Sequence, residues 1–247
     1  MIDHHRIALV TGANKGIGFA VARALAADGM TVLLAARDPG RGDEATAALR
    51  AEGLDVHRLT LDVSEPGSVR EAAERVETRF GRLDVLVNNA GISGGASQTP
   101  GAADLDTVLA VFDTNVFGVI RVTDAVLPLI RRSSQGRVVN VSSGVGSMGN
   151  MTDPAHYMSR LPALVGYPSS KAALNALTVQ YAKELRPYGI LVNAVAPGAC
   201  DTDFTRDLGY DLTRTAAEGA GIVVQLATAG PDGPTGGFFD DDGPVRW

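Results

Sequence analysis

The chain has 247 residues, of which 45% are hydrophobic and 20% charged, and its formal net charge is −6. This size and composition predict one soluble globular domain, residues 1–247, and the acidic balance without any Lys/Arg cluster argues against a nucleic-acid partner. No apolar run approaches the ~18 residues of a membrane span, the four histidines show no metal-ligand spacing, and the single cysteine, Cys200, excludes an internal disulfide and favours a cytoplasmic location.

Seven short apolar runs, rich in β-branched residues, predict β-strands along the chain. The first run follows an N-terminus in which we expect no signal peptide. Most of the runs are apolar on both faces, as expected for a parallel sheet that helices cover on both sides. The predicted strands are residues 6–12, 31–37, 56–63, 83–90, 137–143, 190–198 and 236–242.

Stretches with helical periodicity lie between these strands, and several of them end in glycine. Strand–helix alternation through the whole chain predicts an α/β fold, a doubly wound Rossmann-type parallel sheet of about seven strands with helices on both faces. Residues 144–166 fit no regular element, and we treat them as an irregular insert. The predicted helices are residues 16–29, 41–53, 66–81, 104–131, 167–189 and a segment near 213–229.

The first predicted strand runs into the glycine-rich turn TGANKGIG, residues 11–18, and then into a helix. Gly12, Gly16 and Gly18 would allow a tight turn and a close approach of the backbone to a pyrophosphate at the helix N-terminus. The spacing is G-x-x-x-G-x-G rather than the G-x-G-x-x-G fingerprint, so a turn that binds nothing is the alternative.

Two basic residues bear on which dinucleotide this turn would bind. Lys15 lies inside the turn, and Arg37 follows the second strand, where the adenosine ribose is expected. NAD-binding sheets often place an acid near that ribose, whereas an arginine suits the 2′-phosphate of NADP. Ala36 precedes Arg37 and Asp38 follows it, so we favour NADP over NAD. The alternative is that Arg37 pairs with Asp38 or with another surface acid.

Two tyrosines lie in and just after the insert, Tyr157 and Tyr167, and only Tyr167 has a lysine four residues later, Lys171. Residues i and i+4 share a helix face. An ammonium ~4 Å from a phenolate is worth about 4 kcal/mol at an effective dielectric of ~20. That attraction would lower a tyrosine pKa from ~10 toward ~7, a useful value for acid–base chemistry. Tyr167 is therefore the predicted catalytic tyrosine. Tyr157 is expected to pack inside the insert or, with His156, to line a substrate pocket.

Two further polar residues stand in order before this pair: Asn115 in TNVFG and Ser143 at the end of RVVNVSS. Singly, each has a structural reading, as a core polar residue or a turn residue. As an ordered set with the other motifs they are specific, and the chain resembles the short-chain dehydrogenase/reductase family in its compact single-domain form. The resemblance rests on TGANKGIG, LDV (61–63), NNAG (88–91), TNVFG, VNVSS, YPSSK and VAPG (195–198). Within the family, the NKGIG turn, the AARD stretch and the final Trp247 look most similar to NADPH-dependent carbonyl reductases.

The resemblance implies roles for four catalytic residues. Tyr167 would be the general acid in reduction and the general base in oxidation, and Ser143, rather than Ser142, would hold the substrate oxygen. Lys171 would lower the pKa of Tyr167 and hydrogen-bond the nicotinamide ribose, and Asn115 would anchor a water in a proton relay.

The resemblance also implies an NADP(H) site along one edge of the sheet. Asp62 and Val63 would contact the adenine, residues 89–91 would line the cofactor cleft, and Thr202 would bind the nicotinamide carboxamide. The implied cofactor-binding residues are Gly12, Asn14, Lys15, Gly16, Ile17, Gly18, Arg37, Asp62, Val63, Asn89, Ala90, Gly91, Tyr167, Lys171, Pro197, Gly198 and Thr202.

The expected function is NADPH-dependent reduction of an aldehyde or ketone to an alcohol, run reversibly. One alternative is an NADP(H)-binding sensor, although such a protein commonly loses the tyrosine or the lysine. Another is a nucleotide-sugar epimerase or dehydratase, which usually needs more chain than the ~50 residues after Gly198.

The substrate, a small carbonyl or alcohol, is expected to contact the insert 144–166 and residues 203–212. Met151 and Leu164, in the insert, are expected to affect substrate choice more than cofactor affinity. Cys200 is expected to be a buried, inert thiol near the nicotinamide. The oligomeric state is left open between a monomer and a dimer or tetramer.

Overall fold

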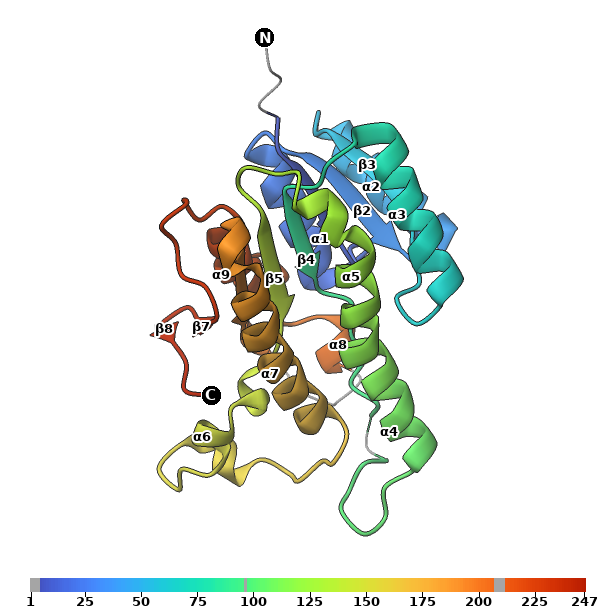
Figure 1. The fold of residues 1–247 in the computed structure, drawn as a ribbon. Coiled ribbons are helices and arrows are strands. Elements are labelled where there is room, and N and C mark those ends of the chain that lie inside the picture. The colour runs from blue at the N-terminus through green and yellow to red at the C-terminus, as the bar shows by residue number, and fades with distance from the viewer. Residues whose placement is uncertain (1–4, 96, 207–211) are drawn as a thin grey trace.

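The computed structural model describes residues 5–95, 97–206 and 212–247, with the side chain of Arg206 not described. In this part of the chain eight strands form one sheet, in the order β3-β2-β1-β4-β5-β6-β7-β8 (Figure 1). Strands β1 to β7 are parallel and only β8 is antiparallel. The predicted doubly wound sheet is confirmed, and the two-residue β8 is an addition to it. The strands are β1 Ile7–Val10, β2 Thr31–Ala36, β3 Val56–Thr60, β4 Val85–Asn88, β5 Arg137–Val141, β6 Leu191–Val195, β7 Phe238–Asp240 and β8 Gly243–Pro244.

Helices cover both faces of the sheet, which is why the central strands are mostly apolar and are buried on both faces. Every residue of β1, β2, β4, β5 and β6 is buried. None of the described helices is long and apolar enough to cross a membrane. The α-helices are α1 Gly16–Ala27, α2 Pro39–Ala51, α3 Pro66–Phe80, α4 Leu105–Phe112, α5 Gly118–Ile130, α6 Met148–Met151, α7 Tyr167–Leu185, α8 Asp203–Arg206 and α9 Ala216–Ala227.

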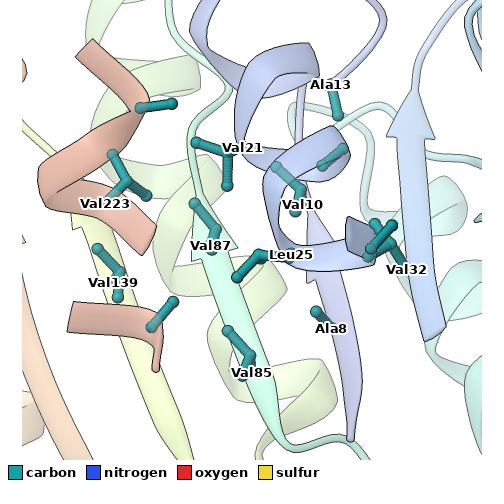
Figure 2. Close-up of a cluster of buried hydrophobic side chains, with 14 of the residues drawn as sticks. Ala8, Val10, Ala13, Val21, Leu25, Val32, Val85, Val87, Val139 and Val223 are labelled. Carbon is teal, nitrogen blue, oxygen red and sulfur yellow. The ribbon is translucent and has the colours of Figure 1, made fainter. Parts of the chain in front are cut away.

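Two hydrophobic cores result, one on each face of the sheet. Ala8 and Val10 of β1 pack against Val21 and Leu25 of α1, and Val223 of α9 completes this core (Figure 2). On the opposite face, helices α3, α5 and α7 pack against the alternate side chains of the same strands. The sheet is thus held from both sides, and the carboxyl ends of its strands are left to form a ligand cleft.

The single helix predicted over residues 104–131 is wrong, because a π-helical turn, η1 Asp113–Phe117, separates α4 from α5. The turn contains Asn115, whose side-chain amide reaches out of the helix to the backbone of Ile92. Arg121 bridges the turn by donating to Asp113 at 2.7 Å. Such π turns widen a helix by one residue and often occur at functional sites.

The insert 144–166 contains only short elements: the 3₁₀ helix η2 Gly144–Gly146, α6, and the 3₁₀ helix η3 Tyr157–Arg160. Its first half is fastened to the last residues of the chain. The Ser147 hydroxyl donates to Arg246 O at 2.6 Å, and Gly149 N donates to Trp247 O at 2.8 Å. The Arg246 guanidinium also pairs with Asp153 at 2.8 Å. The insert is therefore an ordered layer that the C-terminal residues support.

Candidate active site

The glycine turn between β1 and α1 lies directly on the end of β4. Gly12 has a φ of 62°, and a Cβ there would be 2.9 Å from Ala90 Cα. A Cβ at Gly18 would be 2.6 Å from Gly12 O and closer still to Asn89 Nδ2. Asn89 Nδ2 donates to Thr11 O at 2.9 Å and to Gly12 O at 3.1 Å. Only glycine fits at Gly12 and Gly18, so the packing of the predicted turn requires glycine at both positions.

The start of α1 has the properties of an anion site. Its N-cap, Lys15, makes no side-chain cap hydrogen bond, and its first turn contains no acidic residue. The first N–H groups of a helix have no partner inside the helix, and here no side chain of the helix itself competes for them. Asn14 and Ile17 lie half-buried in the same turn. These residues fit the pyrophosphate of a dinucleotide.

Arg37 and Asp38 follow β2 and take different roles. The Asp38 carboxylate caps α2 by accepting from Arg41 N at 3.0 Å. Arg37 is exposed and has no side-chain partner among the described residues. The alternative in which Arg37 pairs with Asp38 is therefore not what the structure shows. The arginine is left available for an anion beside the carboxyl end of β2.

Lys15 lies across the mouth of the turn from α8. Its ammonium pairs with Asp203 at 2.7 Å, and both side chains are 55% exposed. An exposed pair of this kind is worth ~0–1 kcal/mol, so Lys15 can exchange this carboxylate for another anion. Thr202 also faces the turn, because its Cγ2 would lie 3.4 Å from a Cβ at Gly16. The segment after β6 thus closes over the glycine turn.

The predicted adenine residues follow β3. Asp62 Oδ1 accepts from Ser64 N at 2.9 Å and from Ser64 Oγ at 2.6 Å, which fixes the loop. Val63 is buried against Gly118 of α5, where a Cβ would be 2.8 Å from Val63 Cγ2. Their contact with an adenine stays a prediction.

Arg214 holds the segment after β6 in place through contacts with Pro197 and Gly198. Arg214 Nε donates to Pro197 O at 3.0 Å, and Gly198, with a φ of 76°, lies against the same guanidinium. Cys200 is buried there, and burial raises the pKa of its thiol. A raised pKa keeps the thiol protonated and unreactive, in line with the inert role expected of it.

The candidate catalytic hydroxyls meet where β5 ends and α7 begins. The side chains of Ser143 and Tyr167 are hydrogen-bonded to each other. Ser142 faces the other way, and its hydroxyl donates to Asn175 Oδ1 at 2.7 Å. Of the two adjacent serines, Ser143 is the one that lies against the tyrosine. A ring of α8, Phe204, covers Tyr167 at a centroid distance of 5.6 Å.

Lys171 lies one helical turn after Tyr167, as the i,i+4 spacing predicts. It is 5% exposed, its ammonium donates to Val141 O at 2.8 Å, and it lies 5.7 Å from the centroid of the Tyr167 ring. Burial lowers the pKa of Lys171 to about 8. Gly91 lies between these groups and Asn115, because a Cβ at Gly91 would be 3.7 Å from the ammonium and 3.2 Å from Asn115 Oδ1.

The expectation that Lys171 brings the pKa of Tyr167 toward neutrality is wrong, because burial of the phenol has the larger effect. Burial raises the pKa of Tyr167 to about 12, and the hydrogen bond from Ser143 acts in the opposite direction. The expectation counted the attraction of the ammonium and left out the cost of burying a phenolate. A raised pKa keeps the phenol protonated at neutral pH, which is the form a general acid requires.

Asn115 is buried, and both of its amide hydrogens are used. Nδ2 donates to Ile92 O at 3.0 Å and to Ser170 Oγ at 3.1 Å, while Oδ1 accepts from Ile92 N at 2.9 Å. Asn115 thus ties the loop after β4 to the first turn of α7. Its predicted part in a proton relay stays a prediction.

Tyr157 lies away from this cluster on the surface of the insert. It is 64% exposed and stacks on His156 at a centroid distance of 4.9 Å. Tyr157 thus packs on another residue of the insert, as expected, but at the surface rather than in an interior, and its alternative place on the wall of a substrate pocket stays a prediction. Of the residues expected to line the substrate pocket, 207–211 lie outside the described part of the chain.

The sequence analysis missed Gln98, a buried residue whose side chain accepts from the backbone N–H of Tyr167 at 2.7 Å. Gln98 lies in a polar, glycine-rich loop, 69 residues before the tyrosine. No local pattern distinguishes it from an exposed loop residue, so only the three-dimensional structure could identify this contact.

The comparisons with known proteins agree with this geometry. The family model described as short chain dehydrogenase matches residues 6–212. A short-chain dehydrogenase, anuI, of Penicillium roqueforti (strain FM164) is 39% identical over 242 residues, which are 96% of this chain and 94% of the relative.

Two solved structures are similar over nearly the whole chain. The NADPH-bound carbonyl reductase from chicken fatty liver has a TM-score of 0.84 at 29% identity, and the match covers 98% of this chain and 99% of that one. A gluconate 5-dehydrogenase from Burkholderia cenocepacia J2315, in complex with NADP and tartrate, has a TM-score of 0.83 at 28% identity and covers 98% and 93%. The resemblance seen in the sequence motifs is confirmed.

Proposed function

Because the chain belongs to the short-chain dehydrogenase family of oxidoreductases, we propose that it is an NADPH-dependent enzyme that reversibly reduces an aldehyde or ketone to an alcohol. The observation that carries the proposal is the cluster of Ser143, Tyr167 and Lys171. The side chains of Ser143 and Tyr167 are hydrogen-bonded to each other, and the buried ammonium of Lys171 lies beside the Tyr167 ring. The cluster adjoins the glycine turn through two successive residues, Ala90 against Gly12 and Gly91 beside Lys171, so a dinucleotide in the cleft would end at these hydroxyls.

The proposed roles follow from where the protons lie. Bound NADPH supplies the hydride. Ser143 and Tyr167 both donate to the carbonyl oxygen, and Tyr167 transfers its proton as negative charge develops there. A pKa of about 12 makes the phenol a proton donor at neutral pH, and Lys171, with a pKa of about 8, carries a proton beside it. Alcohol oxidation needs the phenolate instead, so it should gain relative to reduction as pH rises.

The charge distribution favours NADP(H) over NAD(H). Arg37 is exposed without a side-chain partner among the residues described, and Asp38 is committed to capping α2. A guanidinium can form a forked, charge-assisted contact with a 2′-phosphate. NADP or NADPH is present in the two similar structures above, which supports the same choice.

In this proposal the whole chain, 1–247, acts as one catalytic domain, and the insert 144–166 forms a wall of the substrate pocket. Phe204 covers the tyrosine from one side. Met158 of the insert lies against Gly144, just after Ser143. Apolar side chains on both sides suit a substrate with an apolar body and one carbonyl group.

The test is a panel of aldehydes and ketones assayed by NADPH consumption, with Tyr167→Phe as the inactive reference. Turnover by the wild type that Tyr167→Phe loses would support the proposal. Tight NADPH binding without turnover of any carbonyl would refute it and favour the sensor alternative.

A further inference from the structure

The catalytic helix begins with an uncapped residue. Tyr167 is the first residue of α7, and its N-cap, Gly166, has no side chain to accept a hydrogen bond. The first N–H groups of a helix need an acceptor from outside it. For Tyr167 that acceptor is Gln98 Oε1, at 2.7 Å.

The amide of Gln98 is itself fixed in one orientation. Nε2 donates to Ser93 O at 2.8 Å and to Gly95 O at 2.7 Å, so both of its hydrogens are used. The side chain is 0% exposed. Because both Nε2 partners are carbonyls, the opposite orientation of the amide would place an oxygen against two oxygens. The hydrogen bond to Tyr167 therefore comes from a buried, rigid group.

Glycines on both sides of Gln98 allow this approach. A Cβ at Gly94 would lie 2.9 Å from Gln98 Nε2, and a Cβ at Gly166 would lie 3.1 Å from Gln98 Cδ. The backbone also joins the two segments, because Val165 N donates to Gln98 O at 2.9 Å. The loop after β4 and the end of the insert are thus packed as one unit around this amide.

The other polar group of the Tyr167 backbone is held as well. Tyr167 O accepts from the Ser170 hydroxyl at 2.7 Å, and Ser170 Oγ accepts from Asn115 Nδ2 at 3.1 Å. The backbone N–H of Tyr167 is therefore held by Gln98, and its C=O is held by Ser170, which Asn115 of the π turn links to Ile92 in the loop after β4. The position of the phenol depends on this double anchor, since the side chain is attached between the two.

We propose that Gln98 is a positioning residue for the catalytic tyrosine, a role that rests on the proposed function. By accepting from the N–H of Tyr167, Gln98 holds the start of α7 so that the phenol meets Ser143 and the carbonyl oxygen. It touches neither substrate nor cofactor in this role. Its loss should affect the proton-transfer geometry and leave dinucleotide binding in place.

The first experiment compares Gln98→Leu with Gln180→Leu, an exposed glutamine on the same helix. Gln98→Leu should lower kcat by between about tenfold and a hundredfold, because misplacement by about 1 Å has effects of this size. The KM for NADPH should stay within about twofold. Hydrogen–deuterium exchange should rise in peptides that cover residues 165–170 and stay unchanged near residue 180. Gln180→Leu should change none of these quantities.

The second experiment uses Gln98→Glu, which tests the hydrogen bonds rather than the volume. A protonated carboxyl can donate to one of the two carbonyls, Ser93 O or Gly95 O, and still accept from Tyr167 N. The ionised form would face both carbonyls with negative charge. The kcat of this variant should therefore be near that of the wild type at low pH and fall, relative to the wild type, as the carboxyl ionises. A general packing defect would instead lower kcat at every pH and raise the KM for NADPH in step.

Unchanged exchange at residues 165–170 in Gln98→Leu, or increased exchange with an unchanged kcat, would overturn the proposal. Failure of the wild type to turn over any carbonyl would refute the proposed function instead. The exchange measurement would then still decide whether Gln98 holds the helix.

Discussion

Replacing Lys171 with methionine should stabilise the fold while removing activity. The lysine is 5% exposed, and its ammonium donates to a backbone carbonyl, Val141 O, rather than to a carboxylate. Burial lowers its pKa from 10.5 to about 8. At about 1.4 kcal/mol for each pH unit, the buried charge costs the folded state about 3 kcal/mol at neutral pH. Loss of the hydrogen bond offsets about 1 kcal/mol of this.

The expected net gain in the free energy of unfolding is therefore about 2 kcal/mol, or about 4–8 °C in Tm for a chain of this size. The gain should also depend on pH. Between pH 8 and 10.5 the unfolded chain binds a proton at this lysine that the folded chain does not, so wild-type stability rises with pH across that window. The advantage of Lys171→Met should be full below the window and absent above it.

The assay is urea unfolding followed by circular dichroism, at about pH 7 and about pH 10, with Lys183→Met as the control. Lys183 is exposed on the same helix, and its replacement should have little effect at either pH. The reasoning is refuted if Lys171→Met is less stable than the wild type at neutral pH, or if its gain is the same at both pH values.

Three further predictions concern the reaction and the cofactor turn. Tyr167→Phe should lower kcat by orders of magnitude with NADPH binding retained, whereas Tyr157→Phe should change kcat little; the opposite pattern would show that the wrong tyrosine has been assigned. Arg37→Ala should reduce the ratio of kcat/KM for NADPH over NADH by between about tenfold and a hundredfold, since one charge-assisted contact is worth about 1.5–3 kcal/mol. A wild-type ratio near one would contradict the NADP assignment. A high ratio that survives the substitution would assign the contact with the 2′-phosphate to another residue. Gly18→Ala should destabilise the fold by about 1–3 kcal/mol and weaken NADPH binding, because its Cβ would lie 2.6 Å from a carbonyl oxygen, whereas Gly67→Ala, with open space around it, should do neither; urea unfolding and fluorescence titration measure both effects.

The sheet could be predicted from the sequence because burial on both faces leaves a local pattern. The four residues of β1, Ile7–Val10, are all apolar and all buried. The end of α3 was equally readable, since Gly81 takes the left-handed conformation there, with a φ of 71°. Such signals depend on a residue and its near neighbours, so they need no knowledge of the fold.

The meeting of Ser143 with Tyr167 was implied by the family resemblance, and the structure places the two side chains together. The raised pKa of Tyr167 could not be predicted, because the cost of burying a phenolate depends on atoms from other elements, such as Phe204 of α8. The contact of Gln98 with Tyr167 joins residues 69 positions apart. The support of the insert by Arg246 spans 99 positions. Neither contact can be recognised from the residues next to it in the sequence.

The π turn at Asp113–Phe117 also sets the rotational phase between α4 and α5. Each residue of an α-helix turns the chain by about 100°, so the extra residue in this turn rotates all of α5 by that amount relative to α4. The apolar stripe of α5, which includes Val119, Val122 and Val126, faces the core only in this phase. A substitution in the turn is a local change, but deletion of one residue there would swing the whole stripe away from the sheet. The spacing between Asp104 and Ile130 is thus as much a part of the fold as the residues within it.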